Sequence, residues 1–256
     1  MKKHYLSKTV AAAFVVVILL AAAIPALGAP DQVRVFVSFA PGAKAAVQNS
    51  LAGIGAEFHY TFDDLNSFVV TVPSQALSGL ARNPNITGIE EDPLRYPVSA
   101  APSKGALSPA ADTVDANGQI VPWGVDAVQA REIWDVNRNG KFDKKAPTGE
   151  GVTVCIIDTG YYAEHEDLAG ADLIGGFSQV DDDYTRDGYG HGTHVAGTIA
   201  AQNNKLGVVG VAPEVSLYIV KIFADDGSWV IKQHASDLVA AANDCAANGA
   251  DIISMS

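Results

Sequence analysis

The sequence predicts an α/β domain built on a parallel sheet, preceded by a smaller α+β module. Residues 151–158 form a nearly continuous β-branched run, as expected of a central parallel strand that is buried on both faces. Residues 215–223 and 251–255 also read as buried strands. Helices predicted at 191–201 and 236–248 separate these strands. Strands that alternate with helices are typical of a parallel sheet.

The α+β module is predicted from residues 33–91, where the elements follow the order β-α-β-β-α-β. This order is the split βαβ pattern of ferredoxin-like folds. Gly53 ends the first helix, and Pro84 lies beyond the end of the second. The predicted strands are residues 33–39, 56–62, 67–72 and 86–91, and the predicted helices are residues 45–51 and 74–81. The fold by itself indicates no function.

A segment rich in Pro, Ala, Ser and Gly separates the module from the α/β domain. Such a composition is typical of a linker, and an exposed linker is where a processing protease finds accessible backbone. We therefore assign residues 29–96 to the module, residues 97–117 to a linker with a processing site, and residues 118–256 to the α/β domain. This last domain opens with a Val-Pro-Trp-Gly segment and an amphipathic run at 127–136.

Residues 1–28 have the composition of a secretory signal peptide. Three lysines lie among the first eight residues, an apolar run covers residues 10–24, and small residues lead up to Gly28. The alternative is a membrane anchor, but the run is shorter than the roughly 20 apolar residues that span a bilayer, and Pro25 follows it. We expect cleavage after Gly28, a secreted protein and no stable membrane anchor.

Composition limits the class of partner and the number of domains. A chain of 256 residues, 48% of them hydrophobic, can bury the cores of two modest domains. The formal net charge of −12 argues against a nucleic-acid partner, which requires a basic face. Cys155 and Cys245 are the two cysteines of the chain, and disulfides persist in exported proteins. They could equally be two small buried thiols, so the sequence leaves their pairing open.

Asp158 and His191 are the candidate catalytic residues. Asp158 ends a predicted central strand, and functional side chains gather at the carboxyl ends of parallel strands. Gly160 lets the chain turn sharply after it. His191 begins a predicted helix of small residues that can pack closely against its neighbours. Histidine acts as general base and general acid near neutral pH when a carboxylate orients its ring, and Asp158 is the expected partner.

Two other interpretations of these residues are weaker. Aspartic proteases use the same Asp-Thr-Gly triplet, but they do so on an all-β fold with a second copy, which this sequence lacks. His191 and His194 could be a metal-binding pair, because His-x-x-His places two imidazoles about one helical turn apart. The sequence offers no third ligand at a convincing spacing and no His-Glu-x-x-His motif.

Three motifs together resemble the subtilisin-like serine proteases, or subtilases. They are Ile-Asp-Thr-Gly at 157–160, His-Gly-Thr-His-Val-Ala-Gly-Thr at 191–198 and Gly-Val-Val-Gly-Val-Ala-Pro at 207–213. The resemblance covers about residues 121–256, and residues 33–92 resemble the inhibitory propeptide of the same family. It implies a subtilisin-like three-layer α/β domain, incomplete here, and a Ser-His-Asp mechanism for hydrolysing peptide bonds in proteins.

The resemblance also implies which residues bind the substrate and where the nucleophile lies. Gly227 and Ser228 match the first of two segments that hold an extended peptide by β-augmentation, and Ser256 opens the second. Taken alone, residues 226–228 would be an ordinary turn. The nucleophilic serine of the family lies in a Gly-Thr-Ser-x-Ala segment, which the sequence does not contain. We therefore expect an amino-terminal fragment of a longer protease that is inactive by itself.

Two loops are candidate calcium sites. The resemblance maps one family site onto side chains and carbonyls from three segments: Gln119, Asp167, Gln202, Asn204, Leu206 and Val208. Such hard oxygen donors suit calcium, and the alternative is a plain surface loop. The second loop has the EF-hand-like spacing of Asp135, Asn137, Asn139, Lys141 and Asp143, although Ala146 stands where a bidentate Glu is usual. Its alternative is a solvated hairpin-like insertion.

These inferences lead to one functional hypothesis and one rival. The hypothesis is the precursor of a secreted serine endopeptidase, with structural calcium, whose propeptide is an intramolecular inhibitor of the enzyme and whose substrates are proteins or peptides. The rival is a catalytically inactive module that binds or inhibits proteases. A serine nucleophile encoded downstream of residue 256 would discriminate the two.

Overall fold

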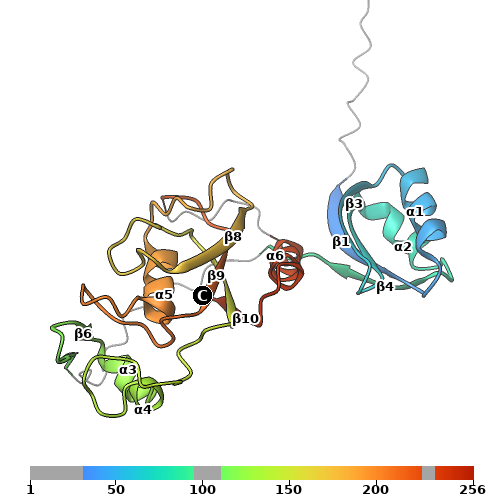
Figure 1. Ribbon diagram of the computed structural model, residues 1–256. Helices are drawn as coiled ribbons and strands as arrows, with labels where there is room; N and C mark the ends of the chain where they lie inside the picture. The colour runs from blue at the N-terminus through green and yellow to red at the C-terminus, as the bar shows by residue number, and fades with distance from the viewer. Residues whose placement is uncertain (1–30, 95–110, 227–233) are drawn as a thin grey trace, which may run out of the picture.

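The computed structural model describes residues 31–94, 111–226 and 234–256 (Figure 1). The predicted signal peptide, most of the predicted linker, and Gly227 and Ser228 lie outside these residues. Among the described residues, no helix combines the length and apolar character needed to cross a membrane. We call residues 31–94 the module and the remaining described residues the sheet domain.

The module contains the six elements expected from the sequence, in the expected order. Its antiparallel sheet has the strand order β2-β3-β1-β4. The elements are β1 (Gln32–Phe39), α1 (Lys44–Gly53), β2 (Glu57–Phe62), β3 (Ser67–Pro73), α2 (Leu77–Leu80) and β4 (Ile86–Glu91). The expected helix over 74–81 is shorter, because its first turn, Ser74–Ala76, is a 3₁₀ helix.

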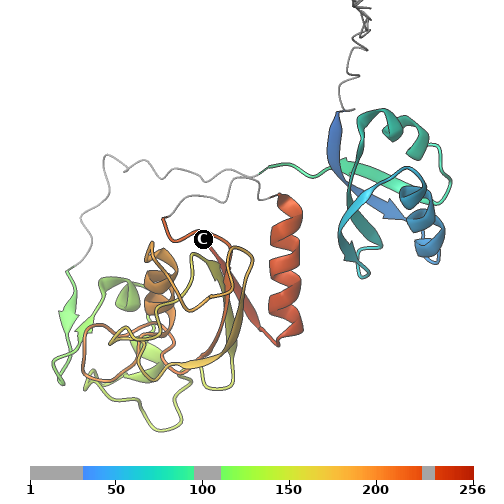
Figure 2. The same ribbon diagram turned by 90° about the horizontal axis from the view of Figure 1, so that it is seen from above.

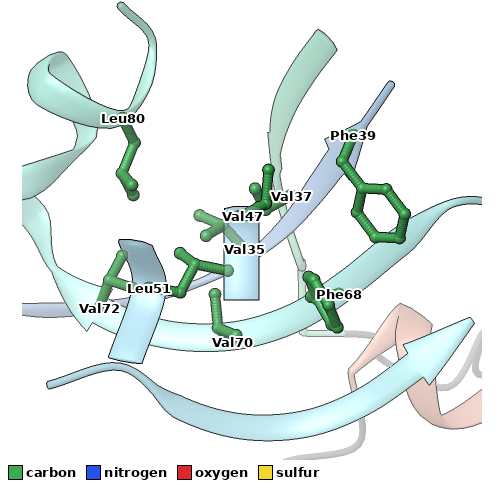
Figure 3. Close-up of a cluster of buried hydrophobic side chains, with 9 residues drawn as sticks. All are labelled: Val35, Val37, Phe39, Val47, Leu51, Phe68, Val70, Val72 and Leu80. Carbon is green, nitrogen blue, oxygen red and sulfur yellow. The ribbon is translucent and has the colours of Figure 1, made fainter. Parts of the chain in front are cut away.

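The core of the module lies between one face of the sheet and its helices (Figure 3). Val47 and Leu51, one turn apart on α1, are fully buried against alternate residues of β1 and β3. The other buried members of this cluster are Val35, Val37, Phe39, Phe68, Val70, Val72 and Leu80. The module therefore has a hydrophobic core of its own.

The sheet domain is organised around a four-stranded parallel sheet with the order β10-β7-β9-β8. Its strands are β7 (Thr153–Asp158), β8 (Asp172–Ser178), β9 (Ser216–Lys221) and β10 (Ile252–Met255), and its long helices are α5 (His191–Ala200) and α6 (Ala235–Ala247). A small hairpin of β5 (Thr113–Val114) and β6 (Ile120–Val121) precedes two short helices, α3 (Trp123–Ala127) and α4 (Arg131–Trp134).

Side chains of β7 alternate between two hydrophobic layers. Val154 and Ile156 pack in the cluster that contains Ala196 and Ala200 of α5. Cys155 and Ile157 pack in the cluster that contains Ala241 and Cys245 of α6. The two helices thus cover opposite faces of the sheet, as Figure 1 shows, and the domain has the expected three layers.

The structure adds two features that the sequence did not predict. Strand β8 was missed because Gly175 and Gly176 interrupt its pattern and because it is a half-exposed edge strand. The amphipathic run at 127–136 is divided between α3 and α4, where Gln129 has a φ of 61°. The left-handed backbone at Gln129 ends α3 and lets α4 start in a new direction.

The structure pairs Cys155 with Cys245, which decides the question that the sequence left open. Their Cα atoms are 5.7 Å apart and the residues are 90 positions apart in the chain. The disulfide joins β7, the strand that carries Asp158, to α6. In both overall views α6 lies between the sheet and the module (Figures 1 and 2).

Candidate active site

Asp158 and His191 meet at the carboxyl edge of the parallel sheet. Asp158 is the last residue of β7 and is completely buried, whereas His191 is the first residue of α5 and exposes 47% of its side chain. His191 Nδ1 lies 2.7 Å from Asp158 Oδ1, which also accepts a hydrogen bond of 2.7 Å from the backbone N–H of Thr159. The expected pair is therefore formed, between residues 33 positions apart.

The carboxylate determines how the imidazole is protonated. An ionised carboxylate only accepts hydrogen bonds, so Nδ1 carries a proton in this contact, and in the neutral imidazole Nε2 then keeps its lone pair. The ring is half exposed, so Nε2 is free to accept a proton from a group outside. Within the described residues, His191 has no serine hydroxyl in hydrogen-bond contact. Among the described residues, the geometry supplies an imidazole that can act as a general base and the carboxylate that orients it.

Two glycines allow α5 to approach the turn after β7. Gly160 has a φ of 125°, and a Cβ there would overlap the carbonyl oxygen of Arg186. A Cβ at Gly192 would overlap the carbonyl oxygen of Gly160 and would come within 3.2 Å of the Asp158 Cβ. The small residues beside His191 are therefore needed for the contact of His191 with Asp158. His194 lies elsewhere on α5, in the wall of an apolar cavity of about 1250 Å³.

Comparison with protein families shows to which family residues of the sheet domain belong. The model of the subtilase family matches residues 149–256. Residues 149–256 belong to the subtilase family.

Curated proteases align over part of the chain. Subtilisin BL of Lederbergia lenta is 43% identical over 139 residues, which are 54% of this chain and 45% of the relative. The alkaline protease of Alkalihalobacillus alcalophilus is 33% identical over 214 residues, covering 83% of this chain and 47% of the relative. The intracellular serine protease of Paenibacillus polymyxa is 45% identical over 121 residues, which are 44% of this chain and 34% of the relative. The chain spans less than half the length of these relatives.

Solved structures give the same fold. Fervidolysin from Fervidobacterium pennivorans, described as a keratinolytic enzyme related to subtilisin, matches with a TM-score of 0.59 at 21% identity. The alignment covers 88% of this chain and 36% of that one. A mutant of the epidermin leader peptide processing serine protease from Staphylococcus aureus matches with a TM-score of 0.58 at 16% identity. This alignment covers 88% of this chain and 50% of that one. The two likenesses support the predicted subtilisin-like α/β fold.

The third expected substrate-binding residue of the subtilase domain is at the same edge of the sheet as the pair. Ser256 follows β10, which runs parallel to β7 with Met255 opposite Ile157. Continuing this register places Ser256 beside Asp158. Gly227 and Ser228 lie outside the described residues.

The first candidate calcium site brings its oxygen donors together around Gln119. The side-chain Nε2 of Gln119 lies 2.8 Å from the carbonyl oxygens of Gln202 and Leu206 and 2.9 Å from that of Val208. An amide nitrogen carries two hydrogens, so it cannot satisfy three acceptors at once. Three carbonyls that converge on one point are a donor set suited to a hard cation.

Asp167 belongs to the same loop cluster, and Asn204 is turned to other partners. Asp167 is 8% exposed and its Oδ1 accepts a 2.9 Å hydrogen bond from the Val208 N–H. Gly207 has a φ of 44°, and a Cβ there would overlap the Asp167 carboxylate. The Asn204 Oδ1 accepts from the Leu206 N–H at 2.9 Å. The site therefore holds one carboxylate among neutral oxygens.

The second candidate loop closes on its own backbone. Asp135 is fully buried and accepts hydrogen bonds from Asn139 N and Gly140 N at 2.8 and 3.0 Å. Asp143 accepts from the Asn137 amide at 3.0 Å, and the Lys141 N–H donates to Asn139 at 2.9 Å. Across the residues that the structure describes, no three His, Cys, Asp or Glu side chains group into a metal-binding cluster. Calcium at this loop stays a prediction.

The module contacts the amino-terminal end of α6 through buried charges. Asp92, 3% exposed, accepts from Ser236 N at 3.0 Å and from Ser236 Oγ at 2.6 Å. Arg34 lies 2.8 Å from Asp92 and 3.2 Å from Asp237, and the Tyr60 hydroxyl donates to Asp237 at 2.9 Å. The Asp92 carboxylate thus neutralises the positive end of the helix dipole.

Beyond Asp92, the chain of the module runs against the segment before α6. The N–H of Ala235 donates to the carbonyl oxygen of Pro93 at 3.0 Å. Leu94 forms an antiparallel bridge with His234. The end of the module is therefore held by backbone contacts to the segment before α6.

Sequence reasoning missed two polar residues near the catalytic pair. Asp187, four positions before His191, accepts hydrogen bonds from Gly190 N and Thr193 N. Lys221 is completely buried and contacts Asp181 and Asp225. Neither could have been found from the sequence. Asp187 lies three positions before the cap residue Gly190, outside the position where a capping side chain is expected. Lys221 lies at the end of a strand that reads as apolar.

Proposed function

We propose that the chain is part of the precursor of a secreted subtilisin-like serine endopeptidase that hydrolyses peptide bonds in proteins. The observation that carries the proposal is the 2.7 Å contact of His191 Nδ1 with Asp158 Oδ1 in a subtilase domain. Relatives of the domain are named as subtilisins and alkaline proteases. The disulfide supports export, because disulfides persist in oxidising compartments.

In the proposed reaction, His191 acts first as a general base and then as a general acid. Its Nε2 takes the proton of a serine hydroxyl as the oxygen attacks the peptide carbonyl, and gives that proton to the amine as the C–N bond breaks. It then takes a proton from the water that attacks the acyl-serine ester and returns it to the serine oxygen as that ester breaks. Buried Asp158 keeps the other proton on Nδ1 and stabilises the imidazolium that forms. The serine is expected from the longer reading frame, and Gly227, Ser228 and Ser256 would hold the substrate as an extended strand.

Labelling of the full-length protein with a fluorophosphonate tests this proposal. We expect one labelled serine in the parent protein, and loss of labelling in His191→Ala. His194→Ala is the matched control, because His194 is on the same helix but faces the apolar cavity, and it is expected to keep the label. Undiminished labelling of His191→Ala would refute the role of His191. A full-length protein with no labelled serine would favour the rival, an inactive module that binds proteases.

We propose, further, that residues 29–96 are the propeptide and inhibit the enzyme until they are removed. The proposal is supported by the contacts of Arg34, Asp92 and Tyr60 with the start of α6 and by the bridge of Leu94 with His234. The chain leads from this bridge to residues 97–117, the predicted linker, where a processing protease would cut. Charged groups buried between two surfaces fix how the surfaces dock, so these contacts would hold the propeptide in one orientation on the sheet domain.

The interface can be tested on the full-length protein after processing. Arg34→Met removes the cation between Asp92 and Asp237, and we expect the cleaved module to dissociate at least about tenfold more readily, since truncating one member of a buried charge pair costs about 2 to 5 kcal/mol. Arg82→Met, on the exposed side of the same module, is the matched control. Equal dissociation of the two variants would contradict the proposed interface.

We propose that calcium binds where the three carbonyls meet. Gln119, Asp167 and the carbonyl oxygens of Gln202, Leu206 and Val208 would hold it. The ion would have a structural role, because these groups come from the hairpin of β6, the segment after Gly160 and the loop after α5, which are distant in sequence. A bound ion would fix that loop and the helix that carries His191.

A further inference from the structure

Asp187 is bound by four donors from both sides of the active site. From α5 it accepts hydrogen bonds of Thr193 N at 2.8 Å and Thr193 Oγ1 at 2.5 Å. Gly190 N donates to it at 2.8 Å, immediately before the helix. The fourth donor is the hydroxyl of Thr159, at 2.8 Å, from the turn that follows β7. One carboxylate therefore joins the start of the catalytic helix to the residue next to Asp158.

The two threonine hydroxyls relay backbone groups to this carboxylate. Thr159 Oγ1 accepts from Gly192 N at 2.8 Å while it donates to Asp187. Thr193 Oγ1 accepts from Tyr162 N at 3.0 Å while it donates to the same carboxylate. Each hydroxyl has a single proton, so its direction depends on an acceptor at Asp187. Thr159 is thus connected to the start of α5 twice, directly through the hydrogen bond from Gly192 N and indirectly through Asp187.

Asp187 performs the capping role that the cap residue of α5 cannot. The cap position is Gly190, which has a φ of 88° and no side chain to accept from the first turn. Burial by itself would raise the pKa of Asp187, but hydrogen bonds from Thr193, Gly190 and Thr159 outweigh it, so the pKa lies below its ordinary value. The group is therefore an anion at neutral pH, at the positive end of α5.

We propose that Asp187 is a positioning residue that sets the hydrogen bond between His191 and Asp158. Its carboxylate fixes the distance between the Asp158–Thr159 turn and the first turn of α5, and His191 is part of that turn. The inference rests on the proposed function for its catalytic meaning, but the geometry that it predicts can be measured without catalysis.

Nuclear magnetic resonance of the chain with isotope-labelled histidine measures that geometry. In the unsubstituted chain we expect a single Nδ1–H tautomer of His191 and a low-field Nδ1 proton. The signals of His191 are assigned as those that disappear in the His191→Gln variant. Asp187→Asn has only one acceptor oxygen and adds a donor, so it cannot hold both hydroxyls. We expect it to lose the low-field proton and to show a mixture of the two tautomers.

Variants of Thr159 separate positioning from the loss of charge. Thr159→Val removes the hydroxyl without changing any charge, and we expect the same mixture of tautomers. Thr159→Ser keeps the hydroxyl and is expected to restore the single tautomer. Asp182→Asn removes a negative charge from an exposed position of the same loop, and it is expected to leave the His191 signals unchanged. Thr159→Val decides the question if Asp187→Asn does not fold.

Two outcomes would overturn the proposal. The first is a folded Asp187→Asn or Thr159→Val chain that keeps the low-field proton and the single tautomer, even if its melting temperature falls. The second is an Asp182→Asn chain that changes the signals as much as Asp187→Asn does. In the full-length enzyme we expect Asp187→Asn to lower kcat at least about tenfold with KM within about twofold. A parent protein without peptidase activity would refute the proposed function alone, because the tautomer measurements would stand.

Discussion

Gly192 and Gly160 lie in direct backbone contact, so that a side chain at 192 would overlap the carbonyl oxygen of residue 160. This contact places the helix of His191 against the turn that follows Asp158. The two residues of the candidate catalytic pair, Asp158 and His191, are thus positioned by two glycines that have no chemical function.

The first prediction concerns these glycines. Gly192→Ala is expected to destabilise the chain by about 1 to 3 kcal/mol, the usual cost of adding atoms to a well-packed site, and to separate His191 from Asp158. Gly197→Ala is the matched control, because a Cβ there meets nothing within 4 Å. Alanine forms helix better than glycine, so that change is expected to be neutral or to stabilise by up to about 1 kcal/mol. Urea denaturation of the two chains measures the difference.

The second prediction concerns Lys221, whose side chain is fully buried between Asp181 and Asp225. Lys221→Met removes the buried cation between the two carboxylates and leaves only Arg186, whose side chain is 57% exposed, in contact with both. Because both carboxylates are partly exposed, we expect a loss near the lower end of the range for breaking a buried pair, about 3 kcal/mol in the free energy of unfolding. Lys144→Met, at an exposed position, is expected to change it by less than about 0.5 kcal/mol. Equal denaturation midpoints of the two variants would contradict the inferred role.

The third prediction concerns the disulfide that ties α6 to β7. Replacing both Cys155 and Cys245 by alanine is expected to lower the free energy of unfolding by about 2 to 5 kcal/mol. The unsubstituted chain should lose a similar amount in a reducing agent, whereas the double variant should not respond to it. Thermal unfolding with and without the reductant makes the measurement. A double variant as stable as the oxidised parent would show that the bond does not stabilise the fold.

The fourth prediction concerns pH at the interface of the module with α6. Burial and the neighbouring Arg34 lower the pKa of His59 below its ordinary value of 6.5. The unfolded chain therefore binds a proton at higher pH than the folded chain, so stability is lost as pH falls from about 6.5 through the folded pKa. His59→Gln removes this titration. We expect the melting temperature of that variant to fall less steeply below pH 6.5 than that of the parent. Parallel curves of melting temperature against pH would contradict the role given to His59.

The fifth prediction concerns calcium. A chelator is expected to lower the melting temperature of the chain, because an ion bound only by the folded form adds to its stability. Gln119→Ala and Asp167→Asn should abolish the response to calcium, whereas Asn137→Ala in the second loop should keep it. A response that survives both changes at the first site and disappears with Asn137→Ala would assign the calcium to the second loop. Identical melting curves with and without chelator in the parent would contradict both sites.

Much of the fold could be predicted from the sequence, because local patterns encode it. The β-branched runs of β7 and β9 and the small-residue pattern of α5 specify buried strands and a closely packed helix. The six-element order of the module was read from the same kind of pattern. Strand β8 was missed, since its two glycines remove the alternation on which such a prediction rests.

The candidate catalytic pair could also be predicted, because position in the fold and chemistry agree for Asp158 and His191. The residues around them could not. Asp187 acts through four hydrogen bonds with groups from two elements, and the fourth donor, Thr159, is 28 positions away in the chain. The burial of Lys221 depends in the same way on a loop that folds over the end of its strand.

The sequence alone determined the element types, the candidate acid and base, and the resemblance to subtilases, because these depend on residue type and local spacing. Only the tertiary structure decided that the two cysteines pair, that three carbonyls converge on Gln119, and that the module contacts α6 through Asp92. Each of these is a contact between segments distant in the chain. Their distances are fixed by the packing of the sheet and its two helical layers, which no local pattern encodes.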